Sequence, residues 1–277
     1  MSDNYSDILQ RIEMRGEPWN ATEDLKEILS EADPDLVERA LDSTAQAMDD
    51  ELAEMHVEIA VDASRSPQTR SRAAIALGPA LETCDMGSWE TNWDPPPLSE
   101  DCYREVKSAL DELVRDEEAP KLVRRRAFEA AVRSPEDWHR EFVDDIRDAD
   151  DADWRLTAVF AARRLGMSEV VMDGFSDPDE RIVREACEGL SHFHPEGSVD
   201  ACKRIAQDAS LETETRISAL WGLAATGADG LYGFFEDLKF DARDADIRNA
   251  ADEALDEWNQ QNRMRREAEE LGDLPEL

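Results

Sequence analysis

Small and apolar residues recur along the chain with the period of an α-helix. In one repeated phrase, an arginine is followed by alanine at the third position, alanine or glycine at the sixth, and a small residue or leucine at the seventh. These offsets place the residues on one stripe of a helix, and a stripe of Ala and Gly lets a neighbouring helix approach closely. The copies are Arg70-Ala73-Ala76-Leu77, Arg124-Ala127-Ala130-Ala131, Arg155-Ala158-Ala161-Ala162, Arg216-Ala219-Gly222-Leu223 and Arg248-Ala251-Ala254-Leu255, with a weaker copy in Val183-Ala186-Gly189-Leu190.

The spacing of these copies predicts pairs of helices. Successive copies begin 54, 31, 28, 33 and 32 residues apart, and the last four intervals each fit two helices with short connections. A second apolar periodicity, typical of an amphipathic partner helix, precedes five of the copies. Its residues are Leu52, Met55 and Ile59; Val106, Leu110 and Leu113; Trp138, Phe142 and Ile146; Val199, Cys202 and Ala206; and Leu231, Phe234 and Leu238. Helix starts are marked by a capping residue followed by proline, at Asp33-Pro34, Ser66-Pro67, Ser134-Pro135 and Asp177-Pro178.

The repeated phrase, following an acidic turn such as Asp244-Ala245-Asp246-Ile247, resembles the second helix of HEAT-like repeats. The resemblance covers residues 50–258 and implies an all-α fold, a right-handed α-solenoid of six or seven helix pairs. In such a solenoid the second helices line a concave surface that binds proteins or extended peptides, although a fold alone does not give a function. We further expect a degenerate helix pair in residues 1–49 to cap one end, and a polar capping helix and tail in residues 259–277 to cap the other.

The long first interval predicts an inserted loop at residues 82–99. This segment contains Trp89, Trp93 and three successive prolines, which cannot continue a helix. Exposed tryptophans are frequent binding anchors, so the two are candidate partner-binding residues. The alternative is that they fold back and cover an end of the solenoid, because large apolar side chains are usually buried.

The charge balance is strongly acidic. Sixty-seven Asp and Glu stand against 31 Lys and Arg, for a formal net charge of -36, and the acids are spread over the whole chain. With only five lysines among the basic residues, the composition resembles that of proteins from salt-in halophiles. At about 1 M salt the Debye length is only about 3 Å, so repulsion between surface carboxylates almost vanishes. We therefore expect a folded protein adapted to high salt.

The repeated arginines Arg70, Arg124, Arg155, Arg216 and Arg248 are predicted to be structural. A guanidinium suits bidentate pairing with carboxylates, and we expect these side chains to bond to acids in the preceding turn. The second reading is an anion-binding ladder. A separate group just past the repeat phrase, Arg163, Arg164, His192 and His194, is predicted either to cap helix ends or to form a basic patch for an acidic peptide or a phosphate.

The sequence shows few of the motifs that enzymes of HEAT-like fold use. Deoxyhypusine hydroxylases hold two irons with paired His-Glu motifs on HEAT-like helices, but this chain has four histidines and no His-Glu dipeptide. HEAT-like alkylpurine DNA glycosylases present a basic face to phosphates; here the basic candidates are Arg124-Arg125-Arg126 and the cluster Arg263, Arg265 and Arg266, each surrounded by acids. Chromophore lyases of HEAT-like fold have no residue-level counterpart, and no cofactor or metal motif is present.

We therefore predict a non-enzymatic scaffold or adaptor that binds a protein or peptide. The alternative is a nucleic-acid-binding or DNA-repair protein of HEAT-like fold. The first ten residues are polar and acidic, and the chain has no apolar run of 18 residues. A cytoplasmic protein without a membrane segment is expected. Most of the widely spaced cysteines Cys84, Cys102, Cys187 and Cys202 are expected to be buried thiols.

Overall fold

The computed structural model describes residues 2–15, 21–87, 89, 96–191, 193–241 and 243–272. These residues form α-helices, one short 3-10 helix and connecting turns, and no strand occurs among them. The all-α prediction is confirmed. The chain divides into two compact units, Met1–Glu136 and Asp137–Leu277, which are described separately.

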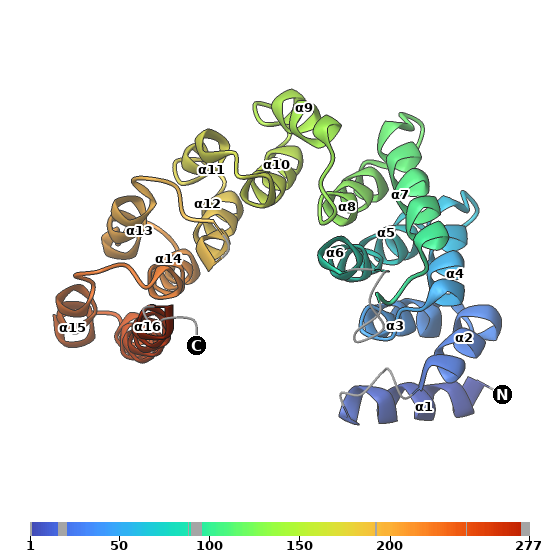
Figure 1. Ribbon diagram of the computed structural model, residues 1–277, viewed down its shortest axis with the longest axis horizontal. Helices are drawn as coiled ribbons and strands as arrows, with labels where there is room; N and C mark the ends of the chain where they lie inside the picture. Colours follow the sequence, from blue (N-terminus) through green and yellow to red (C-terminus); the bar gives the residue numbers. More distant parts are fainter. Residues whose placement is uncertain are drawn as a thin grey trace. The chain divides into compact units, whose positions relative to one another are not determined.

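The first unit is built from two layers of helices. In Figure 1, α2, α4 and α7 lie in one layer and α3, α5 and α8 in the other. Each helix of the first layer packs on the helix that follows it in its pair, and α5 packs on both α3 and α8. The bounds are α1 Ser2–Arg15, α2 Thr22–Glu31, α3 Pro34–Thr44, α4 Asp50–Val61, α5 Pro67–Ala76, α6 Gly78–Met86, α7 Glu100–Arg115 and α8 Lys121–Ala131.

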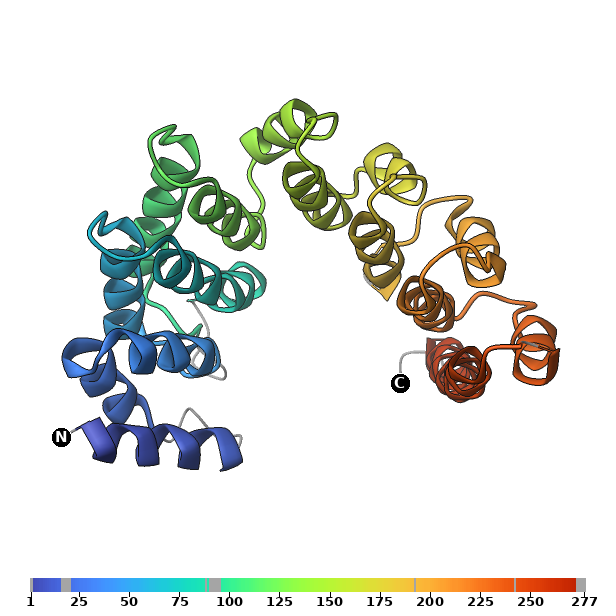
Figure 2. The same ribbon diagram turned by 180° about the vertical axis from the view of Figure 1, so that it is seen from behind.

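The second unit repeats this plan more regularly. Helices α9, α11, α13 and α15 form the first-helix layer, and α10, α12, α14 and α16 form the second-helix layer, as Figure 1 and the reverse view in Figure 2 show. Each second helix packs on the second helix of the next pair. The bounds are α9 Asp137–Ile146, α10 Ala152–Leu165, α11 Ser168–Gly174, α12 Glu180–Glu188, α13 Ser198–Gln207, α14 Thr213–Thr226, α15 Tyr232–Asp241 and α16 Ala245–Gly272, with a 3-10 turn, η2, at Gly189–Ser191. This stacking of adjacent pairs is that of a HEAT-like repeat.

The small-residue stripes lie where neighbouring helices meet. Every alanine, glycine and leucine of the six repeat phrases is buried. The closest approach is at Gly222 of α14, where an added Cβ would lie 2.4 Å from the carbonyl oxygen of Cys187 on α12. Backbone therefore packs directly on backbone at this point, because glycine has no side chain to keep the helices apart.

Two of the predicted helix starts are confirmed by capping bonds. The Asp33 carboxylate accepts a hydrogen bond from the backbone N of Leu36 at 3.2 Å, and the Ser66 hydroxyl accepts one from Thr69 at 3.0 Å. At the Asp177-Pro178 pair the start lies two residues later, because Asp179 caps α12 by accepting from the backbone N of Arg181. Both arrangements satisfy N–H groups that a helix end leaves without partners.

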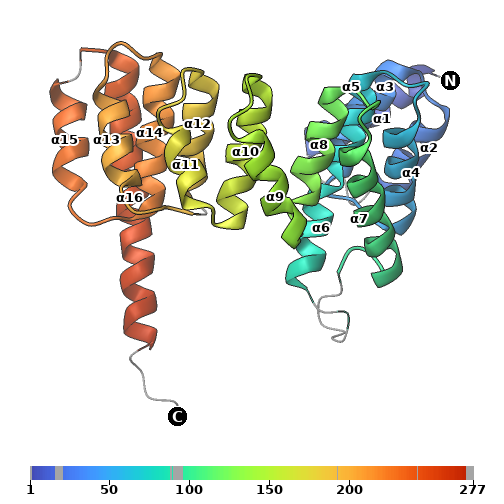
Figure 3. The same ribbon diagram turned by 90° about the horizontal axis from the view of Figure 1, so that it is seen from above.

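Three segments differ from the sequence-based expectation. Residues 1–49 contain α1 in addition to the predicted pair formed by α2 and α3. The expected loop at 82–99 begins as helix, since α6 continues to Met86. No separate helix begins near residue 259, because α16 runs without a break for 28 residues and extends beyond its neighbours (Figure 3). No glycine or proline interrupts residues 245–271, so the sequence there gives no signal for a stop.

Candidate functional site

The repeated arginines serve as caps within each helix pair. The Nε atoms of Arg70, Arg124 and Arg216 donate to carbonyl oxygens ten residues upstream, those of Ala60, Val114 and Ala206, at 2.8, 2.9 and 3.1 Å. Each acceptor lies in the last turn of the first helix of the same pair, where carbonyls lack helical partners and the helix dipole favours a cation. These bonds to backbone carbonyls suit a structural role. The charge of Arg216 also helps to lower the pKa of Asp208, an acid in the preceding turn.

The other two arginines bond the turn itself. Arg155 Nη1 donates to the carbonyls of Ala149 and Asp150 at 2.9 and 3.1 Å, and Arg248 Nη1 donates to the carbonyl of Arg243 at 3.2 Å. An acid pairs with Arg155, but it comes from the turn of the following repeat: Asp177 accepts from Nε and Nη2 at 2.8 and 3.0 Å.

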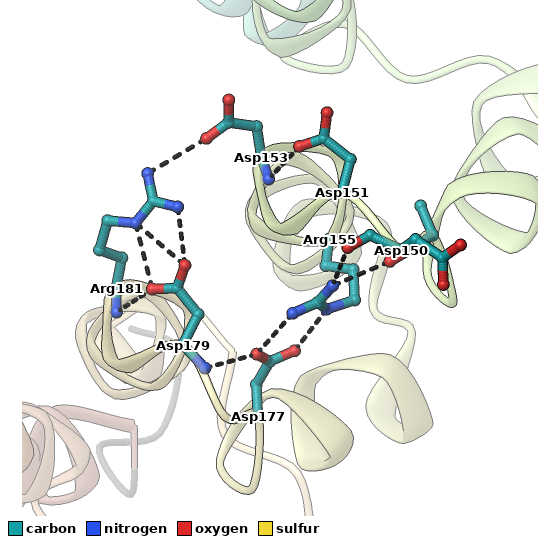
Figure 4. A network of polar contacts seen from close by, with 8 residues as sticks. Asp150, Asp151, Asp153, Arg155, Asp177, Asp179 and Arg181 are labelled. Carbon is teal, nitrogen blue, oxygen red and sulfur yellow. Dashed lines mark hydrogen bonds and ion pairs between the residues drawn. The ribbon is translucent and has the colours of Figure 1, made fainter.

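A ladder of Asp and Arg extends from this pair along the turns of the second unit (Figure 4). Asp177 also accepts from the backbone N of Asp179 at 2.8 Å, and Arg181 bridges Asp179 at 2.7 Å and Asp153 at 3.1 Å. Burial alone would raise the pKa of Asp177, but the hydrogen bonds from Arg155 and the Asp179 backbone hold that pKa below its ordinary value. The ladder ties α10 to α12, and the hydrogen bonds from Arg181 also hold the pKa of Asp179 below its ordinary value.

An open hollow of about 490 Å³ lies beside this ladder. Its lining consists of Arg155, Pro178, Asp179, Glu180, Arg181, Arg184 and Glu212. Three arginines would suit an anion, but each is ion-paired: Arg184 contacts Glu212 at 3.0 Å, in addition to the pairs described above. Because the charges of these three arginines are already neutralised, none of them is free to bind an anion in the hollow.

Trp89 folds back onto the first unit. Its Nε1 donates to the carbonyl of Leu98 at 3.0 Å, and its ring lies 5.2 Å from that of Tyr103. It keeps 39% of its surface exposed. These contacts fit the packing alternative better than a free binding anchor. Trp93 lies outside the described residues.

Beside Trp89, a polar cluster that the sequence did not reveal joins α7 to the end of α8. The hydroxyl of Ser134 lies 2.6 Å from that of Tyr103 and 3.0 Å from Lys107 Nζ, and Lys107 pairs with Glu136 at 2.8 Å. A serine beside a lysine suggests nucleophilic chemistry, which needs an unprotonated base and an accessible hydroxyl. Ser134 is fully buried, and although burial lowers the pKa of Lys107, its contacts with Glu136 and Tyr103 raise it on balance. The cluster therefore fits a structural contact.

The predicted basic patch is engaged within the chain. Arg163 pairs with Glu185 of α12 at 3.1 Å, and the guanidinium groups of Arg163 and Arg164 lie 4.9 and 5.0 Å from the centre of the Phe160 ring. His194 is exposed after η2, and His192 lies outside the described residues. Arg163 and Arg164 thus contact their own helix layer instead of standing free for an acidic ligand.

Other site types can be assessed for the described part of the chain. Nowhere in it do three or more His, Cys, Asp or Glu side chains gather as metal ligands could. No helix in the described ranges has both the length and the apolar character needed to cross a bilayer. The four cysteines are free and buried, as expected.

One exposed surface of the second unit lies on its layer of second helices, and we call it the second-helix face. It is defined by Phe160 on α10, Glu188 on α12, Trp221 on α14 and Glu253 on α16, each at the fifth position after the first residue of its repeat phrase. Glu188, Trp221 and Glu253 are exposed and Phe160 is partly so. Aligning the repeats by their phrases could have found this row, since the phrase marks buried positions and the fifth position lies outside its stripe.

Comparisons with known proteins show similarity of fold at low sequence identity. No family model matches the chain, and no curated protein matches it in sequence. Among solved structures, the YibA protein of E. coli is 13% identical, with a TM-score of 0.48 over 86% of this chain and 95% of that one. Human deoxyhypusine hydroxylase in complex with glycerol is 15% identical, with a TM-score of 0.40 over 87% and 85% of the two chains. An engineered protein is 16% identical, with a TM-score of 0.39 over 90% and 70%.

Proposed function

We propose that this protein is a non-enzymatic scaffold or adaptor that holds a protein partner on the second-helix face of its second unit. The observation that carries the proposal is Trp221, a tryptophan 38% exposed in the middle of a layer of stacked second helices. Tryptophan is enriched among residues that dominate protein interfaces because it buries a large apolar area on binding.

The charges favour a protein over a nucleic acid. Binding to nucleic acid derives most of its affinity from cations that neutralise phosphates. In this chain the arginines of the predicted basic runs are used internally: Arg124 bonds the Val114 carbonyl, and Arg125 and Arg126 both pair with Glu129. Arg263 is exposed. The structure does not describe the side chains of Arg265 and Arg266. Among the described residues, the predicted basic runs therefore do not provide the row of free cations that nucleic-acid binding would need.

The setting that fits the composition is a cytoplasm of high salt. Many described ion pairs are exposed and contribute little in dilute solution, about 0–1 kcal/mol each. They cannot offset repulsion within a chain of net charge -36, whereas molar salt screens that repulsion. We therefore place the scaffold activity at molar salt.

The test is affinity capture from an extract of the source organism in molar KCl, with the eluate divided for nuclease treatment and analysed by quantitative mass spectrometry. Proteins enriched over a bait-free control and retained after nuclease treatment are the expected result. Recovery of nucleic acid, or of proteins that nuclease treatment releases, would instead support the alternative function. A lack of any enriched protein would contradict the proposal.

A further inference from the structure

The second-helix face contains one aromatic site that the chain fills with its own arginines. At the fifth position of the α10 repeat, the Phe160 ring has the guanidinium groups of Arg163 and Arg164 at 4.9 and 5.0 Å from its centre. Arg163 also reaches across to Glu185 on α12 at 3.1 Å. An aromatic ring on one helix and a carboxylate on the next thus hold a guanidinium between them, combining cation–π attraction with an ion pair.

Trp221 on α14 and Glu188 on α12 also place an aromatic ring and a carboxylate on adjacent helices, with the carboxylate here on the earlier helix of the two. Gly222 packs on Cys187, so Trp221, the residue before Gly222, and Glu188, the residue after Cys187, both lie next to this contact between the two helices in sequence. The Ser218 hydroxyl, one turn before Trp221, donates to Glu188 Oε1 at 3.2 Å and draws that carboxylate toward α14. Within the described part of the chain, neither Trp221 nor Glu188 has a cation as partner.

The sequence explains this difference between the two sites. The eighth and ninth positions of the repeat are Arg163 and Arg164 on α10 but alanines, Ala224 and Ala225, on α14. Residues four apart on a helix are surface neighbours, so Ala225 lies beside Trp221 as Arg164 lies beside Phe160. The exposed Glu253, at the fifth position of α16, adds a second carboxylate on the helix that packs on the other side of α14.

We propose that Trp221, Glu188 and Glu253 bind a basic, extended segment of the partner protein, with an arginine of that segment stacked on Trp221 as Arg164 is on Phe160. The inference rests on the proposed function and names the chemistry of its partner. Helices packed at about 9 Å place α12 and α16 about 18 Å apart, which an extended chain spans in about five or six residues. The segment therefore carries flanking cations at about that spacing, directed at Glu188 and Glu253.

The test is fluorescence anisotropy with a fluorescein-labelled peptide of arginine-glycine repeats, and with its glutamine-for-arginine counterpart as the neutral probe. The titration is run on the full chain in about 1 M KCl, where a Debye length of about 3 Å suppresses general attraction to the acidic surface. We expect the arginine peptide to bind and the glutamine peptide not to bind. Trp221→Ala should weaken binding about tenfold, as the loss of a desolvated cation–π contact would.

The sharpest variant adds a group instead of removing one. Ala225→Arg gives α14 its own guanidinium beside Trp221 and should also weaken binding about tenfold, whereas Ala225→Met adds comparable length without charge and should bind like the wild type. Phe240→Ala is the matched aromatic control, because Phe240 is 70% exposed on α15 in the first-helix layer. Circular-dichroism melting verifies that each variant is folded.

Several outcomes would overturn the inference. Unchanged binding by both Trp221→Ala and Ala225→Arg would do so, as would equal binding of the neutral probe. So would a wild-type dimer that Ala225→Arg abolishes, because the face would then serve a second copy of the chain. If the capture experiment recovers a protein that Ala225→Arg still retains, the scaffold function stands and this inference fails. If it recovers no protein, the scaffold function itself fails.

Discussion

Replacing Gly222 with alanine should destabilise the second unit even though alanine is the better helix former. In the interior of a helix, Gly→Ala gains about 1 kcal/mol of intrinsic propensity. At Gly222, however, the new Cβ would lie 2.4 Å from the Cys187 carbonyl oxygen, whereas ordinary contacts begin at 3.4 Å. Helices α12 and α14 must therefore separate by about 1 Å, and overpacking against rigid backbone costs about 3 kcal/mol, the upper part of the usual range.

The net loss is then about 2 kcal/mol, or about 6 °C in Tm for a unit of this size. Thermal unfolding followed by circular dichroism in molar KCl measures it. Two other glycines provide controls. Gly233 on α15 has open space around its would-be Cβ, and Gly189 meets only the flexible Arg163 side chain. Gly233→Ala should not lower Tm, and Gly189→Ala should lower it less than Gly222→Ala. A Gly222→Ala protein as stable as the wild type would refute the close-packing argument.

Two further predictions concern solution conditions. His56 is fully buried. Its Nδ1–H donates to the Leu52 carbonyl, and its Nε2 lies within hydrogen-bond distance of the Thr44 hydroxyl, at 2.7 Å each. Burial lowers its pKa from 6.5 to about 4. Between pH 6.5 and pH 4 the unfolded state binds a proton more readily than the folded state, so the free energy of unfolding falls with pH, by about 3 kcal/mol at pH 4. Urea denaturation of the wild type and of His56→Leu measures this loss. The difference in unfolding free energy between the two proteins should change by that amount from pH 7 to pH 4, and a constant difference would contradict the prediction. The helical signal should also melt at a much lower temperature in dilute buffer than in multimolar KCl, and equal melting temperatures would refute the adaptation to high salt.

The repeat architecture could be predicted because its signal is local and recurrent. The phrase around Arg216 and its copies place small residues on one helical stripe, and this fixes both the helix and the face that packs. The short helix α11 was not predicted, because seven residues show too little periodicity. In α15 the fully buried aromatic residue is Phe235 and not the predicted Phe234. The two are adjacent in the sequence, and the spacing of apolar residues alone does not determine which of them faces the core.

The candidate site depends on relations between repeats, which a single phrase does not contain. Arg155 pairs with Asp177 of the next repeat, and the role that we propose for Trp221 depends on Glu188 of another helix. The reading of Arg163 and Arg164 as part of a basic patch depends on such relations too. Arg163 looked free in the sequence, but Glu185, 22 residues later, is its partner. Contacts of this kind depend on how two helices lie against each other, which the hydrophobic pattern constrains only loosely.

The most direct test of the account is site-specific photocrosslinking from the second-helix face. The full chain is prepared with p-benzoylphenylalanine in place of Trp221 or, as the control, in place of Phe240, and is irradiated in cell extract in molar KCl. We predict that position 221 crosslinks to a discrete protein whose joined peptide is rich in arginine or lysine, and that position 240 does not. Equal crosslinking from both positions, or crosslinks to nucleic acid, would contradict the account.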